Sequence, residues 1–450
     1  MNEQPGEDRS APAGGMLRAT FARLLGKAAL AFMRLRGGGS ALPGLLVERL
    51  DPDVLIRSRA AFNEVILVAG TNGKTTTTKM LRAILEADQR KVFTNAAGSN
   101  MPRGVISALI ARCDWRGRLD ADVALLEVDE GYAGALAEAL QPDVVVVLNL
   151  LRDQLDRYGE LDRTARLLAA AVRTADRAVL NADDPRVAAL AGHAAAVDWF
   201  GASAQVRALV PSDDALHGPA PEEGAVTEPP QEGGVTEPRR VEVQAVTPAS
   251  VGQQLTLIID GTEQDVTLRL AGTFNAYNAA AALTAARSVE VDPAVALAAL
   301  SEVTPAFGRS EQLVINGTTV LILLVKNPSG FNHIIHTYLT GATPATVLIA
   351  VNDLDADGRD VSWLWDVDIE ALRGTPHRYA TTGTRGYDMA LRLRYADVDA
   401  QPELSTATAL ATALDTAQAG TTLYLVATYT AMLDLRRKLA RSTDLSRIEV

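Results

Sequence analysis

The chain has 450 residues, of which 48% are hydrophobic and 22% charged, and its formal net charge is -12. This length predicts about two or three domains with ordinary cores, and the composition is typical of a globular enzyme. The acidic balance disfavours a nucleic-acid partner, because phosphate backbones are bound through basic surfaces.

Cysteine content and hydropathy bear on the cellular compartment. Cys113 is the only cysteine, which excludes an internal disulfide and a cysteine-based zinc site and fits a reducing compartment. Residues 1–15 are polar and lack the apolar region of a signal peptide. No segment has about 18 uncharged apolar residues in a row, so no transmembrane helix is expected. We therefore expect a cytoplasmic protein, with peripheral contact at the inner face of the membrane as a further option.

Residues 16–36 have the pattern of a basic amphipathic helix. Its apolar residues recur at helical spacing and so share one face. They are Leu17, Phe21, Leu24, Leu25, Ala28, Phe32 and Leu35. The basic residues at other positions are Arg18, Arg23, Lys27, Arg34 and Arg36. Such a helix can lie on a membrane surface, but we favour a helix packed on its own domain with a solvated basic face.

Between residues 61 and about 200, short apolar runs alternate with helical stretches. The runs that we interpret as buried strands are residues 64–70, 91–96, 122–130, 143–150 and 177–184. Helices are predicted over residues 76–87 and 161–175, between these strands. This alternation predicts an α/β fold with a doubly wound parallel sheet and with binding sites at the carboxyl ends of the strands.

The first strand runs into "VAGTNGKTTTTKM", residues 68–80. A strand that ends in a glycine-rich turn and opens a helix presents free backbone N–H groups and the positive helix end to an anion. Lys74 adds a charge for the β- and γ-phosphates, and the hydroxyl of Thr75 or Thr76 can hold Mg²⁺. The general pattern would have glycine where this chain has Val68, but "GTNGKTT" is recognisable in its own right. The segment therefore predicts a nucleoside triphosphate site.

Acidic residues at the end of a neighbouring predicted strand could complete this site. Glu127 is placed to reach Mg²⁺, as hard oxygen ligands do, and we favour this role over that of a solvated strand-end carboxylate. Asp129 and Glu130 are weaker candidates.

Two later groups of polar residues are also candidates. Asn181, Asp183 and Asp184 lie in the turn "LNADDP", for which a nucleotide contact and a simple Asp-Pro turn are weighed evenly. Asn275 and Asn278, in "GTFNAYNAA" at the expected start of a helix, could read an adenine edge or act only in helix capping.

The composition changes between about residues 205 and 245, where Pro, Gly and Glu dominate. Such a segment buries too little apolar surface to order itself, so we interpret it as a flexible insertion. A hairpin that turns near Asp260 and Gly261, followed by a helix, is expected over residues 253–289. From about residue 311 a second alternating series predicts a separate, smaller α/β domain. Its expected strands are residues 319–325, 345–353, 378–383, 396–400 and 421–428.

A series of phrases, "GTNGKTT", "LLEVDEG", "NLLRDQLDRYGE", "LNADDP", "GTFNAYN" and "FGRSE", occurs in this order. Together they resemble the Mur ligases, which use ATP to convert a carboxylate into an acyl phosphate that an amine then attacks. The phrases "LVKNPSGFNHII" (324–335) and "NDLDADGRDVSWLWDVDIE" (352–370) narrow the resemblance to the MurT family, the ligase subunits of lipid II isoglutaminyl synthases.

The resemblance implies a division of the chain and a fold. An N-terminal helical segment (1–60) would pack on a central Mur-ligase ATP-binding domain (61–310), which contains the insertion at about 205–245. A smaller C-terminal α/β domain (311–450) would contact a partner.

The resemblance also implies roles for individual residues. Lys74 and Glu127 would act in catalysis, and Thr76 and Glu127 would hold Mg²⁺. Asn275 and Asn278 would lie at the adenine. The full set expected to contact ATP is Gly70, Thr71, Asn72, Gly73, Lys74, Thr75, Thr76, Asn275, Asn278 and Arg309.

In the MurT family the ammonia comes from a separate glutaminase subunit of the GatD type. The acidic residue that completes the glutaminase's Cys-His pair is supplied by MurT, and the resemblance places it at Asp360, with Asp355, Asp357 and Asp366 as fallbacks. A carboxylate lent across an interface would orient the imidazole and stabilise its charged form. On the residues alone, "DADGRD" is more typical of a surface turn or a divalent-ion loop.

The implied substrate is lipid II or a related muropeptide precursor at the inner membrane face. Its D-glutamate α-carboxylate would become the amide of D-isoglutamine, with ATP and Mg²⁺ required. No zinc is expected, because this chain lacks the four cysteines of the ribbon that many family members carry in the middle domain. The Pro/Glu/Gly-rich insertion occupies that place.

The remaining candidate residues give weaker evidence of function. Cys113 lies at the end of a predicted helix without a nucleophile pattern, so the ammonia must come from another polypeptide. His333 and His336, three apart on a predicted helix, could bind metal, but further ligands are not evident. Trp363 and Trp365 would share a face and either anchor a partner or pack in the core.

Two alternatives stay open on the sequence. One is a Mur-type or folylpolyglutamate-synthase-like ligase that adds an amino acid and needs no partner. The other is a nucleotide-binding scaffold without enzymatic activity.

Overall fold

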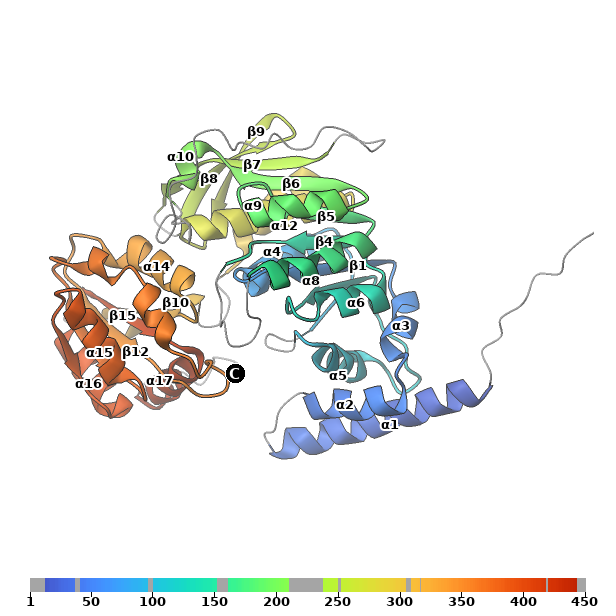
Figure 1. The fold of residues 1–450 in the computed structure, drawn as a ribbon, viewed down its shortest axis with the longest axis horizontal. Helices are drawn as coiled ribbons and strands as arrows, with labels where there is room; N and C mark the ends of the chain where they lie inside the picture. The colour runs from blue at the N-terminus through green and yellow to red at the C-terminus, as the bar shows by residue number, and fades with distance from the viewer. Residues whose placement is uncertain are drawn as a thin grey trace, which may run out of the picture.

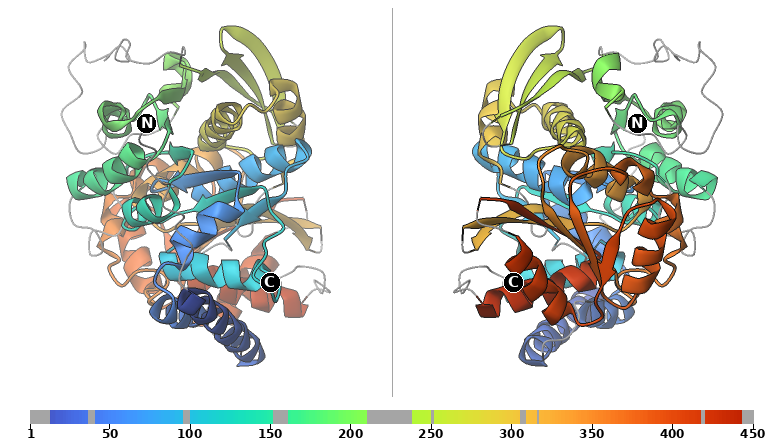
Figure 2. Two further views of the ribbon diagram at one scale, coloured as in Figure 1. Left: turned by 90° about the vertical axis from the view of Figure 1, so that its right-hand side faces the viewer. Right: turned by 90° about the vertical axis from the view of Figure 1, so that its left-hand side faces the viewer.

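The computed structural model describes residues 13–36, 41–95, 100–151, 161–209, 238–249, 252–304, 309–315, 317–417 and 420–442. A central and a C-terminal α/β domain lie side by side (Figure 1). Helices α1 (Ala13–Arg36) and α2 (Ala41–Leu50) lie along one edge of the central domain, and Figure 2 shows this arrangement from two further directions. Most of the predicted insertion lies outside the described residues.

Within the described residues, nine strands form the central sheet in the order β2-β3-β1-β4-β5-β6-β7-β8-β9. Neighbours are parallel from β2 to β7, and the last three strands are antiparallel. The strands are β1 (Glu64–Ala69), β2 (Val92–Thr94), β3 (Val123–Glu127), β4 (Val144–Val147), β5 (Arg177–Asn181), β6 (Val197–Ala202), β7 (Arg240–Pro248), β8 (Gln253–Ile259) and β9 (Thr262–Leu268). The order confirms the predicted doubly wound sheet. Strand β1 lies between β3 and β4, where the order of the parallel strands reverses, so the loop after β1 is at the topological switch point.

Helices cover both faces of this sheet. The face that packs on α4 (Lys74–Ala87), α12 (Thr273–Ser288) and α13 (Pro293–Glu302) forms one apolar cluster. The other face packs on α5 (Pro102–Arg112), α6 (Ala133–Leu140) and α8 (Leu161–Thr174). The shorter helices of this part are α3 (Val54–Ser58), η1 (Arg59–Ala61), α9 (Pro185–Ala188), η2 (Ala189–His193) and α10 (Ala204–Arg207).

Strand β1 explains why the sequence pattern is a continuous apolar run rather than an alternating one. Ile66 and Val68 belong to the cluster on one face of the sheet, and Val65, Leu67 and Ala69 to the cluster on the other. A strand buried on both faces needs apolar residues at every position. The run "VILVA" therefore fixes β1 in the middle of the sheet.

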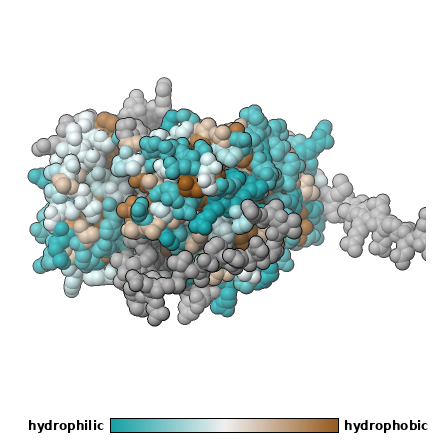
Figure 3. Space-filling model, turned by 90° about the horizontal axis from the view of Figure 1, so that it is seen from above, coloured by the Kyte–Doolittle hydropathy of each residue, from teal (hydrophilic) through white to brown (hydrophobic). Residues whose placement is uncertain are grey.

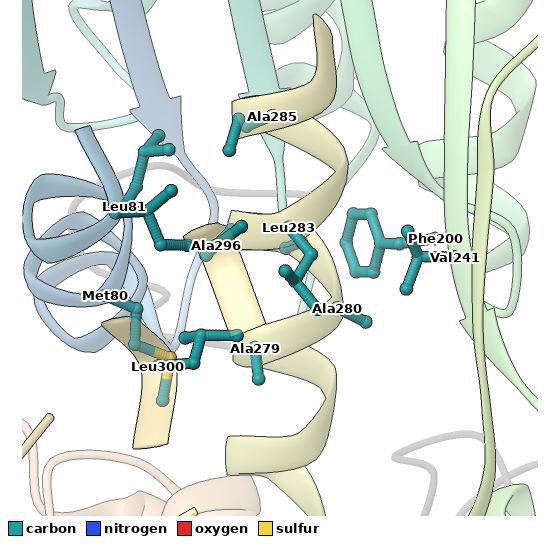
Figure 4. Packing of buried hydrophobic residues seen from close by; sticks show 14 of the residues in the cluster. Met80, Leu81, Phe200, Val241, Ala279, Ala280, Leu283, Ala285, Ala296 and Leu300 are labelled. Carbon is teal, nitrogen blue, oxygen red and sulfur yellow. The ribbon is translucent and has the colours of Figure 1, made fainter. Parts of the chain in front are cut away.

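Helix α12 is buried on nearly all sides. Figure 4 shows Ala280 and its neighbours between Met80 and Leu81 of α4 on one side and Phe200 and Val241 of the sheet on the other. Alanine side chains allow such a close approach and cost little side-chain entropy in a helix. The packing holds the first turns of α12 beside the loop that follows β1.

The C-terminal domain contains a sheet of six described strands in the order β10-β11-β15-β12-β13-β14. These are β10 (Arg309–Ile315), β11 (Thr318–Leu324), β12 (Thr346–Ala350), β13 (Arg378–Thr382), β14 (Ala400–Pro402) and β15 (Thr422–Ala427). Only the β10-β11 pair is antiparallel within this part of the structure. The helices are α14 (Pro328–Ile334), the π-helix η3 (Ile335–Leu339), η4 (Ser362–Asp366), η5 (Ile369–Leu372), α15 (Gly386–Tyr395), α16 (Thr406–Thr416) and α17 (Tyr429–Ser442).

Strands β6, β7 and β10 were not predicted from the sequence. In β6 the fully buried Asp198 interrupts the apolar pattern; it pairs with Arg177 at 2.9 Å and accepts a hydrogen bond from Ser288 at 2.7 Å. These partners offset the cost of burying a charge. Strand β7 begins at Arg240, so the last residues of the range predicted as an insertion belong to the sheet.

Candidate active site

The loop between β1 and α4 requires glycine at two positions. Gly70 and Gly73 have φ values of +131° and +90°. A Cβ atom on Gly73 would lie 2.2 Å from the Oδ1 atom of Asn278, on α12. The backbone therefore passes close to its neighbours and opens α4 at Lys74, which leaves the first N–H groups of a 14-residue helix to face an anion.

Lys74 brings its charge into this loop. The side chain is buried, and its Nζ atom lies 2.5 Å from the carbonyl oxygen of Gly70 and 3.2 Å from Oε1 of Glu130. Glu130 was only a weak candidate in the sequence. The structure thus places a buried ammonium and a buried carboxylate together at the loop.

The hydroxyl of Thr75 donates to Oε2 of Glu127 over 2.9 Å. Strand β3 lies beside β1 with Val68 opposite Glu127, which brings this carboxylate to the loop. Asn95, at the end of β2, accepts from the Glu127 N–H at 3.0 Å and donates to its carbonyl at 2.8 Å. The side chain of Thr76, the predicted Mg²⁺ ligand, is buried, and it is Thr75 that stands next to Glu127.

These oxygens fit a magnesium ion bound together with a nucleotide. Mg²⁺ is usually held by one or two protein oxygens, substrate phosphates and waters. Among the described residues, no group of three or more His, Cys, Asp or Glu side chains could hold a metal by itself. The Thr75 and Glu127 oxygens would be the protein's share of such a site.

Sequence reasoning missed Asn149, which follows β4. Its Oδ1 accepts from the backbone N–H of Asn72 at 2.8 Å, and its Nδ2 donates to the Asn72 carbonyl at 3.0 Å. Its own carbonyl accepts from the Thr71 N–H at 3.1 Å. The sequence feature that could have indicated this role is a polar residue directly after a buried strand that lies next to β1. Asn149 therefore fixes the path of the loop from the adjacent strand.

The "LNADDP" residues support this region from one strand further away. Asn181 donates to the Leu148 carbonyl at 2.9 Å, and Asp184 accepts from the Leu150 N–H at 2.7 Å and caps α9. Asp183 accepts from the Tyr277 hydroxyl at 2.8 Å. Burial raises the pKa of Asp183 and of Asp184. Such contacts within the protein are those expected of a structural Asp-Pro turn.

Asn275 and Asn278 are buried near the start of α12. The Asn275 amide donates to the Ala271 carbonyl at 2.7 Å and accepts from Asn278 at 3.3 Å. The Asn278 oxygen faces Gly73, as described above. The adenine role of these residues stays a prediction. Arg309 begins β10, and its side chain lies outside the described part of the chain.

The C-terminal domain contacts the loop through a pair of amides. Asn327 donates from Nδ2 to Oδ1 of Asn72 at 3.1 Å, and Asn72 donates back to Oδ1 of Asn327 at 3.4 Å. Asn327 is almost fully buried and also caps α14 by accepting from the Gly330 N–H. Asn149 holds the backbone of Asn72, and Asn327 holds its side chain.

We expect the Asn72-Asn327 pair to position the C-terminal domain on the loop. In Asn327→Ser the hydroxyl can still cap α14 but cannot form the reciprocal amide pair. Turnover should fall about five- to tenfold, which corresponds to about 1 kcal/mol for the lost hydrogen bonds, while ATP affinity changes little. A double-mutant cycle with Asn72→Ser should show coupling. Asn63→Ser, at an exposed asparagine, is the control, and strictly additive effects would contradict this role.

A second contact between the domains involves His333 of α14. Its ring lies 4.1 Å from that of Phe274, centroid to centroid, in an edge-to-face arrangement, and its Nε2 lies 3.0 Å from the Thr337 hydroxyl. Burial, with a smaller effect of His336, lowers the pKa of His333 to about 3. His336 instead contacts Asp368 at 3.0 Å. The two histidines thus have separate partners, and the structure gives no support to their binding one metal.

The low pKa of His333 predicts a stability that depends on pH. The imidazole is neutral in the folded state and would be protonated below its ordinary pKa of 6.5 in the unfolded state. Its contribution is therefore complete above pH 6.5 and declines as the pH falls toward 3, by at most about 1.4 kcal/mol per pH unit. Between pH 8 and pH 5, the melting temperature should fall less for His333→Gln than for the parent protein. His193→Gln, at an exposed histidine, should follow the parent.

Asp360 lies on an exposed part of the C-terminal domain, in the loop before η4. Its Oδ1 accepts from the Ser362 N–H at 2.8 Å, and the backbone and side-chain hydrogen bonds of Ser362 lower the pKa of Asp360. Among the described residues, no cation pairs with Asp360. Asp355 pairs with Arg359, and Asp357 is buried against Thr430.

The prediction that Trp363 and Trp365 share a face is wrong. They lie on the 3-10 helix η4, where residues two apart point in different directions. Trp363 packs edge-to-face on Phe331 at 6.5 Å and joins the core. Trp365 is 52% exposed and contacts Tyr395 at 5.3 Å.

Cys113 caps the end of α5 and is buried. Burial raises the pKa of its thiol. A buried thiol with a raised pKa is a poor nucleophile, in line with the expectation that this cysteine takes no part in catalysis.

The fold is that of the Mur ligases. The family profile of the Mur ligase middle domain matches residues 68–218. MurF from Acinetobacter baumannii superposes with a TM-score of 0.67 at 18% identity, over 89% of this chain and 80% of that one. MurF from Thermotoga maritima in complex with ADP gives 0.64 at 15% identity, over 98% and 88%. These low identities show the fold alone.

Sequence comparison then narrows the class to one family. The profile of the MurT ligase C-terminal domain matches residues 324–432. The MurT subunit of the glutamine-hydrolyzing lipid II isoglutaminyl synthase of Streptococcus pneumoniae R6 is 30% identical over 454 residues, 94% of this chain and 97% of the relative. That of Staphylococcus aureus N315 is 29% identical over 80% and 84%. The chain belongs to the MurT family of ligases, which act in peptidoglycan synthesis.

Proposed function

We propose that this chain uses ATP to amidate the α-carboxylate of the D-glutamate in the lipid II stem peptide, with ammonia from a GatD-type glutaminase subunit. The observation that carries the proposal is a phosphate loop joined by Asn72 and Asn327 to the same domain that presents the exposed carboxylate of Asp360. The names of the relatives, which describe a subunit of a glutamine-hydrolyzing synthase, support it.

In the first half-reaction, a carboxylate oxygen of the substrate attacks the γ-phosphorus of ATP. The bond between that phosphorus and the bridging oxygen breaks, and ADP and an acyl phosphate form. Lys74 and the first N–H groups of α4 offset the charge on the phosphoryl oxygens. Mg²⁺, when bound near Thr75 and Glu127, would supply further charge neutralisation.

In the second half-reaction, ammonia attacks the carbonyl carbon of the acyl phosphate. The carbon-oxygen bond to phosphate breaks, inorganic phosphate leaves, and the nitrogen loses a proton to give the amide. Most free ammonia is protonated at neutral pH and is not nucleophilic. Asp360 would act in the partner's site, where it orients the histidine that activates the glutaminase cysteine.

The finer assignments belong to the same proposal. Thr76 would support the loop or the metal, Asn275 and Asn278 would lie near the adenine, and Arg309 would lie near the phosphates. Two solved structures with this fold support nucleotide binding: MurF of Thermotoga maritima in complex with ADP, and folylpolyglutamate synthase of Mycobacterium tuberculosis complexed with ADP and AMPPCP.

A reconstituted reaction tests this function. The chain is purified alone and together with a co-expressed glutaminase candidate, and a muropeptide substrate is analysed by mass spectrometry for the change from acid to amide. We expect amidation with the partner plus glutamine, or with the chain alone plus concentrated ammonium. Ligation of an amino acid by the isolated chain would instead establish the partner-independent alternative.

A further inference from the structure

Helix α1 contacts the central domain through its small residues. Ala22 is fully buried, and a Cβ atom on Gly26 would lie 2.5 Å from a methyl carbon of Val47 and 3.3 Å from one of Ile110. The helix therefore lies close against α2 and α5 along the edge of the molecule (Figures 1 and 2). This packing decides which face of α1 is turned outward.

The outward face carries the large apolar side chains. Phe21, Leu24 and Leu25 are 61%, 43% and 38% exposed, and Phe32, two turns further on, is 53% exposed. Their spacing places them on one side of the helix. The apolar face expected from the sequence thus points away from the domain. By contrast, the surface seen from the opposite side of the molecule is mainly hydrophilic, with small scattered hydrophobic areas (Figure 3).

Helix α1 is positively charged, although the whole chain is acidic with a net charge of -12. The sequence of α1, "AGGMLRATFARLLGKAALAFMRLR", contains arginines and a lysine but no acidic residue. The groups described on it bond to backbone carbonyls rather than to carboxylates: Arg18 to Leu50, Arg23 to Trp115, and Lys27 to Ile110 and Cys113. Among the residues that the structure describes, none forms an ion pair with these three groups.

The loop after α5 extends the same surface. Trp115 is 72% exposed, and its ring centroid lies 5.4 Å from the Nζ atom of Lys27. Arg112, the last residue of α5, and Arg116 and Arg118 in this loop are exposed. The loop also contains Asp114, whose carboxylate accepts hydrogen bonds from the backbone N–H groups of two of these arginines. Within residues 112–118 the three arginines therefore outnumber the one carboxylate, and Asp120, further along the loop, pairs with Lys91.

We propose that α1 and the loop 112–118 form a docking surface for an anionic phospholipid bilayer. An apolar helix face flanked by basic residues inserts shallowly into the headgroup region while the cations meet anionic lipids, and an exposed tryptophan suits the same interface. A second copy of the chain fits less well, because a two-fold interface would put this basic surface against itself. None of the helices in the described part of the chain combines the length and apolar character needed to span a membrane.

Docking would hold the enzyme at the surface that presents a lipid-linked substrate. Only this consequence rests on the proposed function, because bilayer binding does not depend on amidation. The two are tested apart: binding is measured with vesicles, and amidation is measured with a water-soluble muropeptide that needs no membrane.

Flotation of the full chain with phosphatidylcholine vesicles, with and without phosphatidylglycerol, tests the proposal. Binding should increase at least about tenfold with the anionic lipid and weaken at high salt. Phe21→Ser combined with Leu25→Ser should lower binding at least about tenfold, while the melting temperature and the amidation of the soluble muropeptide stay unchanged. Val314→Ser, at a residue that is 68% exposed on β10, is the matched control.

Several outcomes would overturn the proposal. These are binding that is absent for all vesicles, binding that is indifferent to lipid charge, and equal binding by the double variant. Self-association of the parent chain that disappears in the double variant, seen by analytical ultracentrifugation without vesicle binding, would show that this face is a dimer interface instead.

Discussion

Replacement of Lys74 by alanine should reduce ATP-dependent amidation about 10²- to 10³-fold. The ammonium lies at the phosphate loop, within 2.5 Å of the Gly70 carbonyl oxygen, where it can offset the charge that develops during phosphoryl transfer. Removal of one such preorganised group typically costs about 3 to 4 kcal/mol of transition-state stabilisation. The measurement is the initial rate of ADP release with substrate, glutaminase partner and glutamine.

Two controls separate catalysis from folding in this variant. Lys79→Ala changes a lysine further along the same helix, whose amine bonds Thr304, and should leave the rate nearly unchanged. Loss of Lys74 also leaves the buried Glu130 without its cation, which can cost several kcal/mol of stability. Glu130→Gln in the same chain removes that charge and should restore the melting temperature but not the activity. A folded Lys74→Ala protein that keeps the biological activity would favour the scaffold alternative.

Replacement of Asp360 by asparagine should abolish glutamine-driven amidation and spare the ammonium-driven reaction. The exposed carboxylate would orient the partner's histidine, and asparagine cannot stabilise the imidazolium. In a serine triad the equivalent change costs about 10⁴-fold, so we expect a loss of at least about 10²-fold here. Parallel mass analysis with glutamine and with concentrated ammonium measures both routes in the same preparation.

Asp355→Asn is the matched control for this substitution. Asp355 lies in the same exposed loop but pairs with Arg359, so its loss should leave both routes intact. Pull-down of the partner by Asp360→Asn shows whether the complex still forms. If glutamine-driven amidation survives in the Asp360→Asn complex, the proposal of a shared catalytic group is wrong.

The fold could be predicted where the burial of an element produces a recognisable apolar pattern in the sequence. Strand β1 is apolar from Val65 to Ala69 because both of its faces are covered there, and the glycines and Lys74 follow directly. Strand β6 could not be predicted in this way, because Asp198 breaks its pattern and is tolerated only through partners from other elements. The helical pattern of residues 16–36 likewise shows which side chains share a face, but not which face turns toward the domain.

The site could be predicted only in part, because several of its contacts join distant parts of the chain. The amides of Asn72 and Asn327 meet across 255 positions, and Asn149 reaches the loop across 77. No local sequence pattern predicts hydrogen bonds between residues so far apart in the chain. The choice between Thr75 and Thr76 depends on how α4 is rotated relative to β3, which spacing alone does not give. The loop itself is local, so its residues were all predictable.

Transfer of ¹⁸O tests the central claim, activation of a carboxylate as an acyl phosphate, most directly. A muropeptide with ¹⁸O in both oxygens of the D-glutamate α-carboxylate is amidated with ATP, and the released phosphate is analysed by mass spectrometry. We predict one ¹⁸O atom in the inorganic phosphate for each amide formed, with ADP as the other product. Unlabelled phosphate beside a full yield of amide, or label in AMP, would contradict the account.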